Sequence, residues 1–213
     1  MRRVRALASA ACLIPLAGLA APLSNDEISE ICAKADDPAQ CARQVETVQL
    51  KRLPNLARRD GNALTVTLYP SGSATFSDSD GPVSGRAYSL WDYLDGINAV
   101  VLYTTQGDTA TFTLLQRATN RRTELPTEPQ LAPDRQHLVT ADICQDRCSN
   151  EIAVWRVSRD GVRKELAWSP GPAWTDAVAR WKDADTLSFE YVGPNGPGTA
   201  EKKLGDPAWK RVP

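Results

Sequence analysis

The spacing of the apolar residues changes near residue 62, from the three-to-four period of helices to the alternation of β-strands. From there on, Gly, Pro, Asn and Asp recur at short intervals and divide the chain into short segments. We therefore expect an antiparallel all-β region and no second long helix after residue 52. The expected strands are residues 63–69, 73–77, 86–94, 98–105, 109–117, 121–125, 137–143, 151–158, 162–168, 176–180, 186–192 and 199–204.

Turn residues between these segments predict tight hairpins. Pro70 and Gly72 separate two alternating segments, and Asp95 followed by Gly96 favours a type I′ turn. Antiparallel hairpins in series are typical of a partial propeller, a curved sheet or a sandwich. We expect a mostly β fold of this kind over residues 61–213, preceded by a short helical hairpin.

Residues 22–60 predict that helical hairpin and a connector after it. Ser24 and Glu27 have the spacing of a capping box, which starts a first helix. Asp37, which stands directly before a proline, repeats the start signal, because proline is favoured at the first position of a helix. The two helices are expected to be joined by a tight turn.

The first 21 residues have the pattern of a cleavable signal peptide. A basic start is followed by an alanine-rich apolar run that is too short for a membrane anchor. We expect cleavage near Ala20 or Ala21. Cys12 precedes most of the apolar run, so we do not expect a lipoprotein. The protein is therefore expected to be periplasmic or secreted and not to span a membrane.

Four cysteines remain after this cleavage, and an even number in an exported chain is typical of two disulfides. Three pairings are possible, and the entropy of loop closure favours the local one. A metal site around the second pair is disfavoured, because its spacing is not that of a zinc knuckle. The expected pairs are Cys32 with Cys41 and Cys144 with Cys148.

Charge and composition exclude several classes of function. The formal net charge is −1, so the chain has no basic excess with which to bind a nucleic acid. A single histidine, His137, excludes metal sites built from several histidines and limits histidine catalysis to one position. We interpret His137 as a structural residue and expect no catalytic residue, metal or cofactor.

A possible repeat occurs at an offset of 49 residues, where Asp134 and Leu138 correspond to Asp183 and Leu187. In each copy an apolar segment, a turn with Asp and a strand follow one another. After the first copy, residues 151–166 form a Trp-Arg-Val strand and an Asp-Gly turn. Residues 126–168 therefore resemble a blade of the Tol-type or WD-like β-propeller repeats of the bacterial envelope. That resemblance implies a propeller-like scaffold and binding to other molecules.

Short acidic pairs are a further candidate for chemistry. Asp78 with Asp80 and Asp183 with Asp185 are pairs of the kind that glycoside hydrolases use. Aspartates at this spacing are more typical of turns, in which the side chain accepts a hydrogen bond from its own backbone two residues on. A carboxylate-dependent hydrolase is therefore an alternative and not the first expectation.

Two sequence features predict surfaces for binding. Trp168 and Trp174 flank a Pro-Gly-Pro loop and are the best candidates for an exposed aromatic surface. Ser84-Gly85-x-x-Tyr88 is similar to the loop with which periplasmic inhibitors of C-type lysozyme plug their enzyme. This resemblance implies inhibition of a cell-wall-degrading enzyme as an alternative function.

Together these features predict a noncatalytic, exported binding protein of the cell envelope. Loops on a rigid β scaffold would bind a protein, a peptide or a glycan. The inhibitor and the hydrolase remain the two alternatives.

Overall fold

The computed structural model describes residues 22–81, 85–171 and 174–213. The expected signal peptide, residues 1–21, lies outside the described residues. Two α-helices, α1 (Asn25–Cys32) and α2 (Pro38–Arg52), precede a chain of antiparallel strands. The strands are β1 (Ala57–Asp60), β2 (Ala63–Thr67), β3 (Ser73–Ser77), β4 (Arg86–Leu94), β5 (Ala99–Gln106), β6 (Thr109–Gln116), β7 (Arg121–Leu125), β8 (Gln130–Leu131), β9 (His137–Asp142), β10 (Glu151–Ser158), β11 (Gly161–Trp168), β12 (Asp176–Trp181), β13 (Thr186–Gly193), β14 (Gly196–Lys203) and β15 (Lys210–Arg211). The mostly β fold is confirmed.

The helical hairpin begins as its capping signals predict. Ser24 Oγ accepts from the Glu27 N–H at 3.2 Å, and the Glu27 carboxylate accepts from the Ser24 N–H at 2.7 Å. Asp37 caps α2 by accepting from the Gln40 N–H at 2.7 Å. A disulfide joins the cysteine that ends α1 to one in the first turn of α2, so α1 is held against the longer helix.

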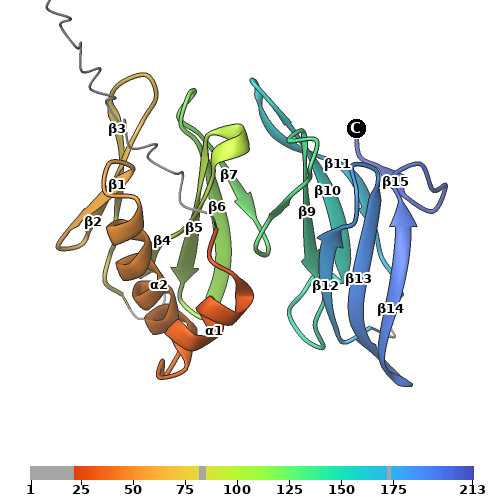
Figure 1. Ribbon diagram of the computed structural model, residues 1–213. Helices are drawn as coiled ribbons and strands as arrows, with labels where there is room; N and C mark the ends of the chain where they lie inside the picture. The colour runs from red at the N-terminus through yellow and green to blue at the C-terminus, as the bar shows by residue number, and fades with distance from the viewer. Residues whose placement is uncertain (1–21, 82–84, 172–173) are drawn as a thin grey trace, which may run out of the picture.

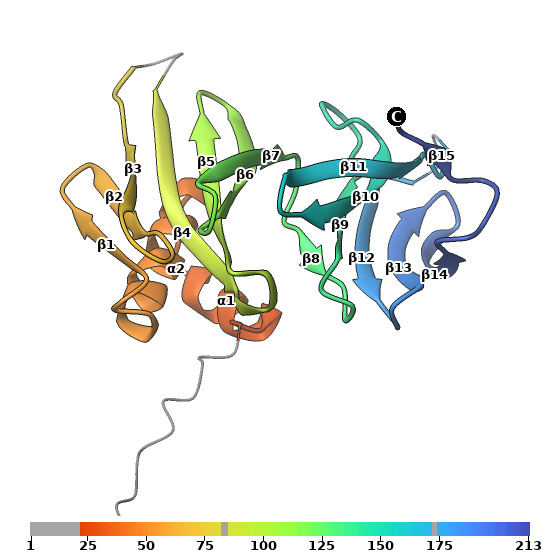
Figure 2. The same cartoon turned by 90° about the horizontal axis from the view of Figure 1, so that it is seen from above.

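The strands form four sheets in the order of the chain: β1–β3, β4–β7, β8–β11 with β15, and β12–β14. We refer to them as sheets A, B, C and D. Within each sheet, strands that follow one another in sequence are neighbours, apart from β15, which adds to β11 at the edge of sheet C. Figure 1 shows the sheets in a row, with A and D at opposite ends, and Figure 2 shows the same row from above.

Burial shows which sheets lie inside this row. β3 of sheet A alternates between exposed and buried side chains, because only one of its faces is covered. β5 of sheet B has four consecutive buried residues, Ala99 to Leu102, because both of its faces are covered. Val100 and Leu102 point to the first core, whereas Ala99 and Val101 point to the third.

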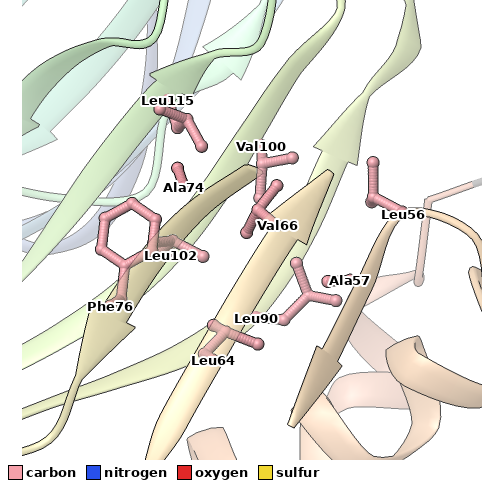
Figure 3. Close-up of a cluster of buried hydrophobic side chains, with 10 residues drawn as sticks. All are labelled: Leu56, Ala57, Leu64, Val66, Ala74, Phe76, Leu90, Val100, Leu102 and Leu115. Atoms are coloured by element: carbon pink, nitrogen blue, oxygen red, sulfur yellow. The ribbon is translucent and has the colours of Figure 1, made fainter. Parts of the chain in front are cut away.

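Three hydrophobic cores fill the spaces between the layers. The first lies between sheets A and B, where Phe76 and Leu64 meet Leu90 (Figure 3). The second lies between sheets C and D around Phe189 and Ile152. The third joins sheet B, sheet C and α2, so the two ends of the row share buried side chains as well as a chain connection.

The sequence missed some local features. The expected connector ends in a strand, β1, which pairs with β2 and completes sheet A. β8 and β15 have two residues each and are too short to leave a periodic signal. The type I′ turn expected at Asp95 and Gly96 is wrong: a short 3₁₀ helix, Asp95–Ile97, connects β4 to β5, and Asn98 takes the left-handed conformation with φ of 48°.

A buried ion network binds α2 to sheets A and B. Arg59 on β1 donates to both carboxylate oxygens of Glu46 on α2, each at 2.9 Å, and to Asp78 at 3.0 Å. Arg43 pairs with both carboxylates as well. The backbone of Tyr88 on β4 closes the network, because its N–H donates to Asp78 at 2.9 Å and its carbonyl accepts from Arg43 at 2.8 Å. The Glu46 side chain is 5% exposed, so these partners replace water.

Both expected disulfides are present, Cys32 with Cys41 and Cys144 with Cys148. Paired cysteines of this kind are typical of proteins that fold outside the reducing cytoplasm. Among the described residues, no helix is long and apolar enough to cross a membrane.

Candidate functional site

The candidate site is a pocket of about 220 Å³ where sheets C and D meet near the start of α1. Its walls come from four parts of the chain: the start of α1, the connection from β7 into β8, β9, and β12. Figure 2 shows β8, β9 and β12 next to one another. The lining residues are Asn25, Thr127, Glu128, Gln130, Val139, Ala141, Ala177, Val178, Ala179 and Arg180.

One wall of the pocket is the open edge of β12. This strand pairs with β13 on one side and has only an isolated bridge, between Cys144 and Asp176, on the other. The Lys182 N–H donates to the Thr186 carbonyl at 2.9 Å, which marks a hydrogen-bonded pair with β13. Because such pairs alternate along an antiparallel strand, the backbone groups of Ala179 face away from β13. In the described chain no hydrogen bond reaches them.

The opposite wall carries polar groups with incomplete hydrogen bonding. Thr127 Oγ1 is shielded from solvent and has no hydrogen-bond partner within the described residues. Burial raises the pKa of the Glu128 carboxyl, the Trp91 side chain partly opposes this rise, and the charge of Asp92 adds to it. Burial also raises the pKa of Asp92, although Arg52 and Gln49 partly offset the effect. Both carboxyl groups are half-buried and the charge of Asp92 acts on Glu128, and of the two only Glu128 lines the pocket.

A tryptophan side chain ties the end of β12 to Gln130, which lines the pocket. The Trp181 indole N–H, at the end of β12, donates to the Gln130 carbonyl of β8 at 2.9 Å. The side chains of β12 alternate, so Ala177 and Ala179 are buried in the second core whereas Val178 and Arg180 are exposed. The lining of the pocket thus includes a backbone edge, the Glu128 carboxyl group and one exposed cation, Arg180.

Trp168 and Trp174 do not lie at this pocket. Their rings meet edge to face at 5.6 Å, and Trp174 stacks on Tyr191 at 3.9 Å. Both are half-buried against the second core, where Trp209 also contacts Trp168. Lys202 lies over the Trp168 ring at 4.6 Å. These tryptophans pack sheet C on sheet D, and the loop residues 172–173 lie outside the described residues.

The lysozyme-inhibitor motif is described only in part. Ser84 lies outside the described residues. Tyr88 belongs to β4, where its ring packs on Phe76 at 5.2 Å and its hydroxyl accepts from Arg86 at 3.3 Å. Its backbone takes part in the ion network of α2. The side chain is therefore held within the scaffold.

The sole histidine and three of the four paired aspartates have structural partners. His137 Nδ1 lies 2.6 Å from an Asp134 oxygen, and its Nε2 lies 3.6 Å from Glu165. Asp134 and Asp183 each accept from the N–H two residues on, so the repeat aspartates occupy equivalent turns of sheets C and D. Asp78 is engaged in the ion network. The pocket instead uses Glu128, which the sequence marks only as a polar residue in a connection.

Comparison with known proteins gives no relative for this arrangement. No family model, no curated protein and no solved structure matches the chain.

Proposed function

We propose that the protein is an exported, noncatalytic binding protein that takes an extended segment of a partner chain into the pocket beside β12. The observation that carries the proposal is the open edge of β12 inside a pocket. Adding a strand to such an edge supplies backbone hydrogen bonds, and neighbouring pockets supply selectivity. A peptide is thus favoured over a glycan as the ligand.

Two other features support this proposal. The two disulfides suit an oxidising compartment such as the periplasm, where the expected signal peptide would direct the chain. The repeated turns and successive antiparallel sheets suit the resemblance to envelope propeller repeats, which stays a prediction. The inhibitor and hydrolase alternatives also stay predictions, and within the described part of the chain no contact at Tyr88 or at the acidic pairs favours them.

The test is a display library of linear nine-residue peptides, selected on the oxidised protein without residues 1–21. Selected peptides are expected to slow hydrogen exchange of the Ala179 amide, measured by NMR, because that N–H joins the new strand. They are also expected to bind Ala179→Pro at least about tenfold more weakly, since proline removes the donor while edge positions tolerate it.

The matched control is Thr75→Pro on β3, the edge strand of sheet A. The Leu68 N–H donates to the Gly72 carbonyl at 3.0 Å, so by the same alternation the Thr75 N–H faces away from β2. This variant is expected to bind the peptides normally. Unchanged exchange at Ala179 in the bound wild type would contradict the proposal, even if Ala179→Pro fails to fold.

A further inference from the structure

The acidic wall of the pocket has a charge that its surroundings do not balance. Glu128 makes no ion pair within the described residues. The charged group that acts on it is Asp92 on β4, which has the same sign. Arg52 on α2 acts on Asp92, and Asp95 opposes it. Among the residues that the structure describes, Glu128 is therefore a half-buried carboxyl group with an acidic neighbour and without a cationic partner.

The cation that lines the pocket does not occupy this wall. Arg180 lies on β12 and is exposed, because its side chain is on the solvent side of sheet D, opposite to the buried Ala179. Asn25, Thr127 and Gln130, which line the pocket together with Glu128, are uncharged. A ligand group that meets Glu128 thus enters a negative, partly desolvated region. Charge-assisted hydrogen bonds are strongest in such regions.

Resting on the function proposed above, we propose that the pocket selects a partner segment with a cationic side chain, which pairs with Glu128. A strand on the edge of β12 places alternate side chains on the same side. One lysine or arginine in such a strand would supply the missing positive charge. Its N–H groups could also donate to Thr127 Oγ1, which has no partner in the described chain.

The test compares three blocked heptapeptides of alternating threonine and valine whose central residue is lysine, norleucine or glutamate. Binding is measured by fluorescence anisotropy at pH 7 and low salt. The lysine peptide is expected to bind about tenfold more tightly than the norleucine peptide, and the glutamate peptide more weakly than both. Glu128→Gln is expected to reduce the preference for lysine to less than about twofold.

The matched control is Glu124→Gln, which removes an exposed carboxylate from β7 and should leave the preference unchanged. The preference for lysine is also expected to fall as the pH is lowered through the raised pKa of Glu128, because the protonated carboxyl has no charge to offer.

The outcomes separate the two proposals. Equal binding of the lysine and norleucine peptides, or a preference that persists in Glu128→Gln, would overturn the cation selection and leave strand addition standing. Tighter binding of the glutamate peptide would assign the selectivity to Arg180 and also overturn it. If display selection and these peptides both give no binding, the function itself is refuted.

Discussion

The two ends of the row of sheets are held together by different chemistry. Sheets A and B are joined to α2 by two arginines and two carboxylates that are largely shielded from water. Sheets C and D are joined by packed rings, among them Trp168, Trp174 and Trp209. An ion network requires every partner, because a single remaining buried charge is costly. An aromatic cluster is less dependent on any one charge. Removing a cation from each end should therefore have unequal effects.

The largest effect is expected at the network. Arg59→Met should lower the free energy of unfolding by about 3–5 kcal/mol, because it leaves the partly exposed Arg43 as the one arginine between the carboxylates of Glu46 and Asp78. Urea denaturation measures this loss. Arg58→Met, at the exposed neighbouring position, serves as the control and should change little. A small loss in Arg59→Met would mean that the network contributes no more than surface ion pairs do.

The disulfides give a second comparison between the same ends. The Cys32–Cys41 loop has a sequence separation of 9, and the Cys144–Cys148 loop has one of 4. In the chain-entropy model, replacing each pair by serines should cost about 2.6 and about 1.9 kcal/mol, respectively. Urea denaturation of the two double-serine variants checks the order. A larger loss for the second pair would show that its loop also positions the bridge to Asp176.

A smaller effect is expected when the cation of the aromatic end is removed. Lys202 lies over Trp168 at 4.6 Å and pairs with the partly exposed Asp206 at 3.0 Å. Lys202→Met keeps the apolar stem, so the loss should be about 1 kcal/mol or less. Lys202→Ala removes the stem as well and should lower the stability further. Thermal unfolding of the two variants measures both losses. A loss as large as that in Arg59→Met would remove the distinction between the two ends.

The smallest effect on the free energy of unfolding, a gain instead of a loss, is expected at Glu128 in the pocket between sheets C and D. Burial raises the pKa of Glu128 above its ordinary value of 4.5. Its protonated form therefore favours the folded state, and this contribution is fully present below pH 4.5 and is lost as the pH rises through the raised pKa. In Glu128→Gln this decrease in stability with rising pH is absent, so the variant should be slightly more stable than the wild type at pH 7.

Urea titrations of both proteins from pH 4 to pH 7 measure this difference. The repulsion between Asp92 and the ionised Glu128 is also absent from Glu128→Gln, and this adds to the gain in stability at pH 7. Glu124→Gln, an exposed control, should follow the wild type. A Glu128→Gln protein that is less stable at pH 7 would show that Glu128 has a stabilising partner.

Much of the local structure could be predicted, whereas the candidate site could not. The capping signals at Ser24 and Asp37 act over three residues, so they work in any fold that allows a helix there. The pocket combines Asn25, Glu128 and Arg180, which are far apart in the chain. Nothing in the sequence around Glu128 distinguishes it from a solvated loop residue.

The ion network left a clearer trace in the sequence. Glu46 and Gln49 lie on the buried face of α2 with Ala42 and Val45. A carboxylate on the buried face of a helix indicates a buried partner, because an unpaired charge would not be tolerated there. The sequence does not show that the partner is Arg59, because the chain contains many other arginines and only the fold decides which of them meets Glu46.

The sequence by itself determined the helical hairpin, the short antiparallel strands and the local disulfides, because each depends on residues that are close along the chain. The apolar run of β5 and the alternation of β3 are local patterns as well, and they agree with a sheet covered on both faces and a sheet covered on one. Only the tertiary structure decided which arginines neutralise Glu46 and that Glu128 lines the pocket between sheets C and D. These contacts depend on how the sheets stack. Stacking brings together residues that are far apart in the chain, and local sequence patterns carry no information about such pairs.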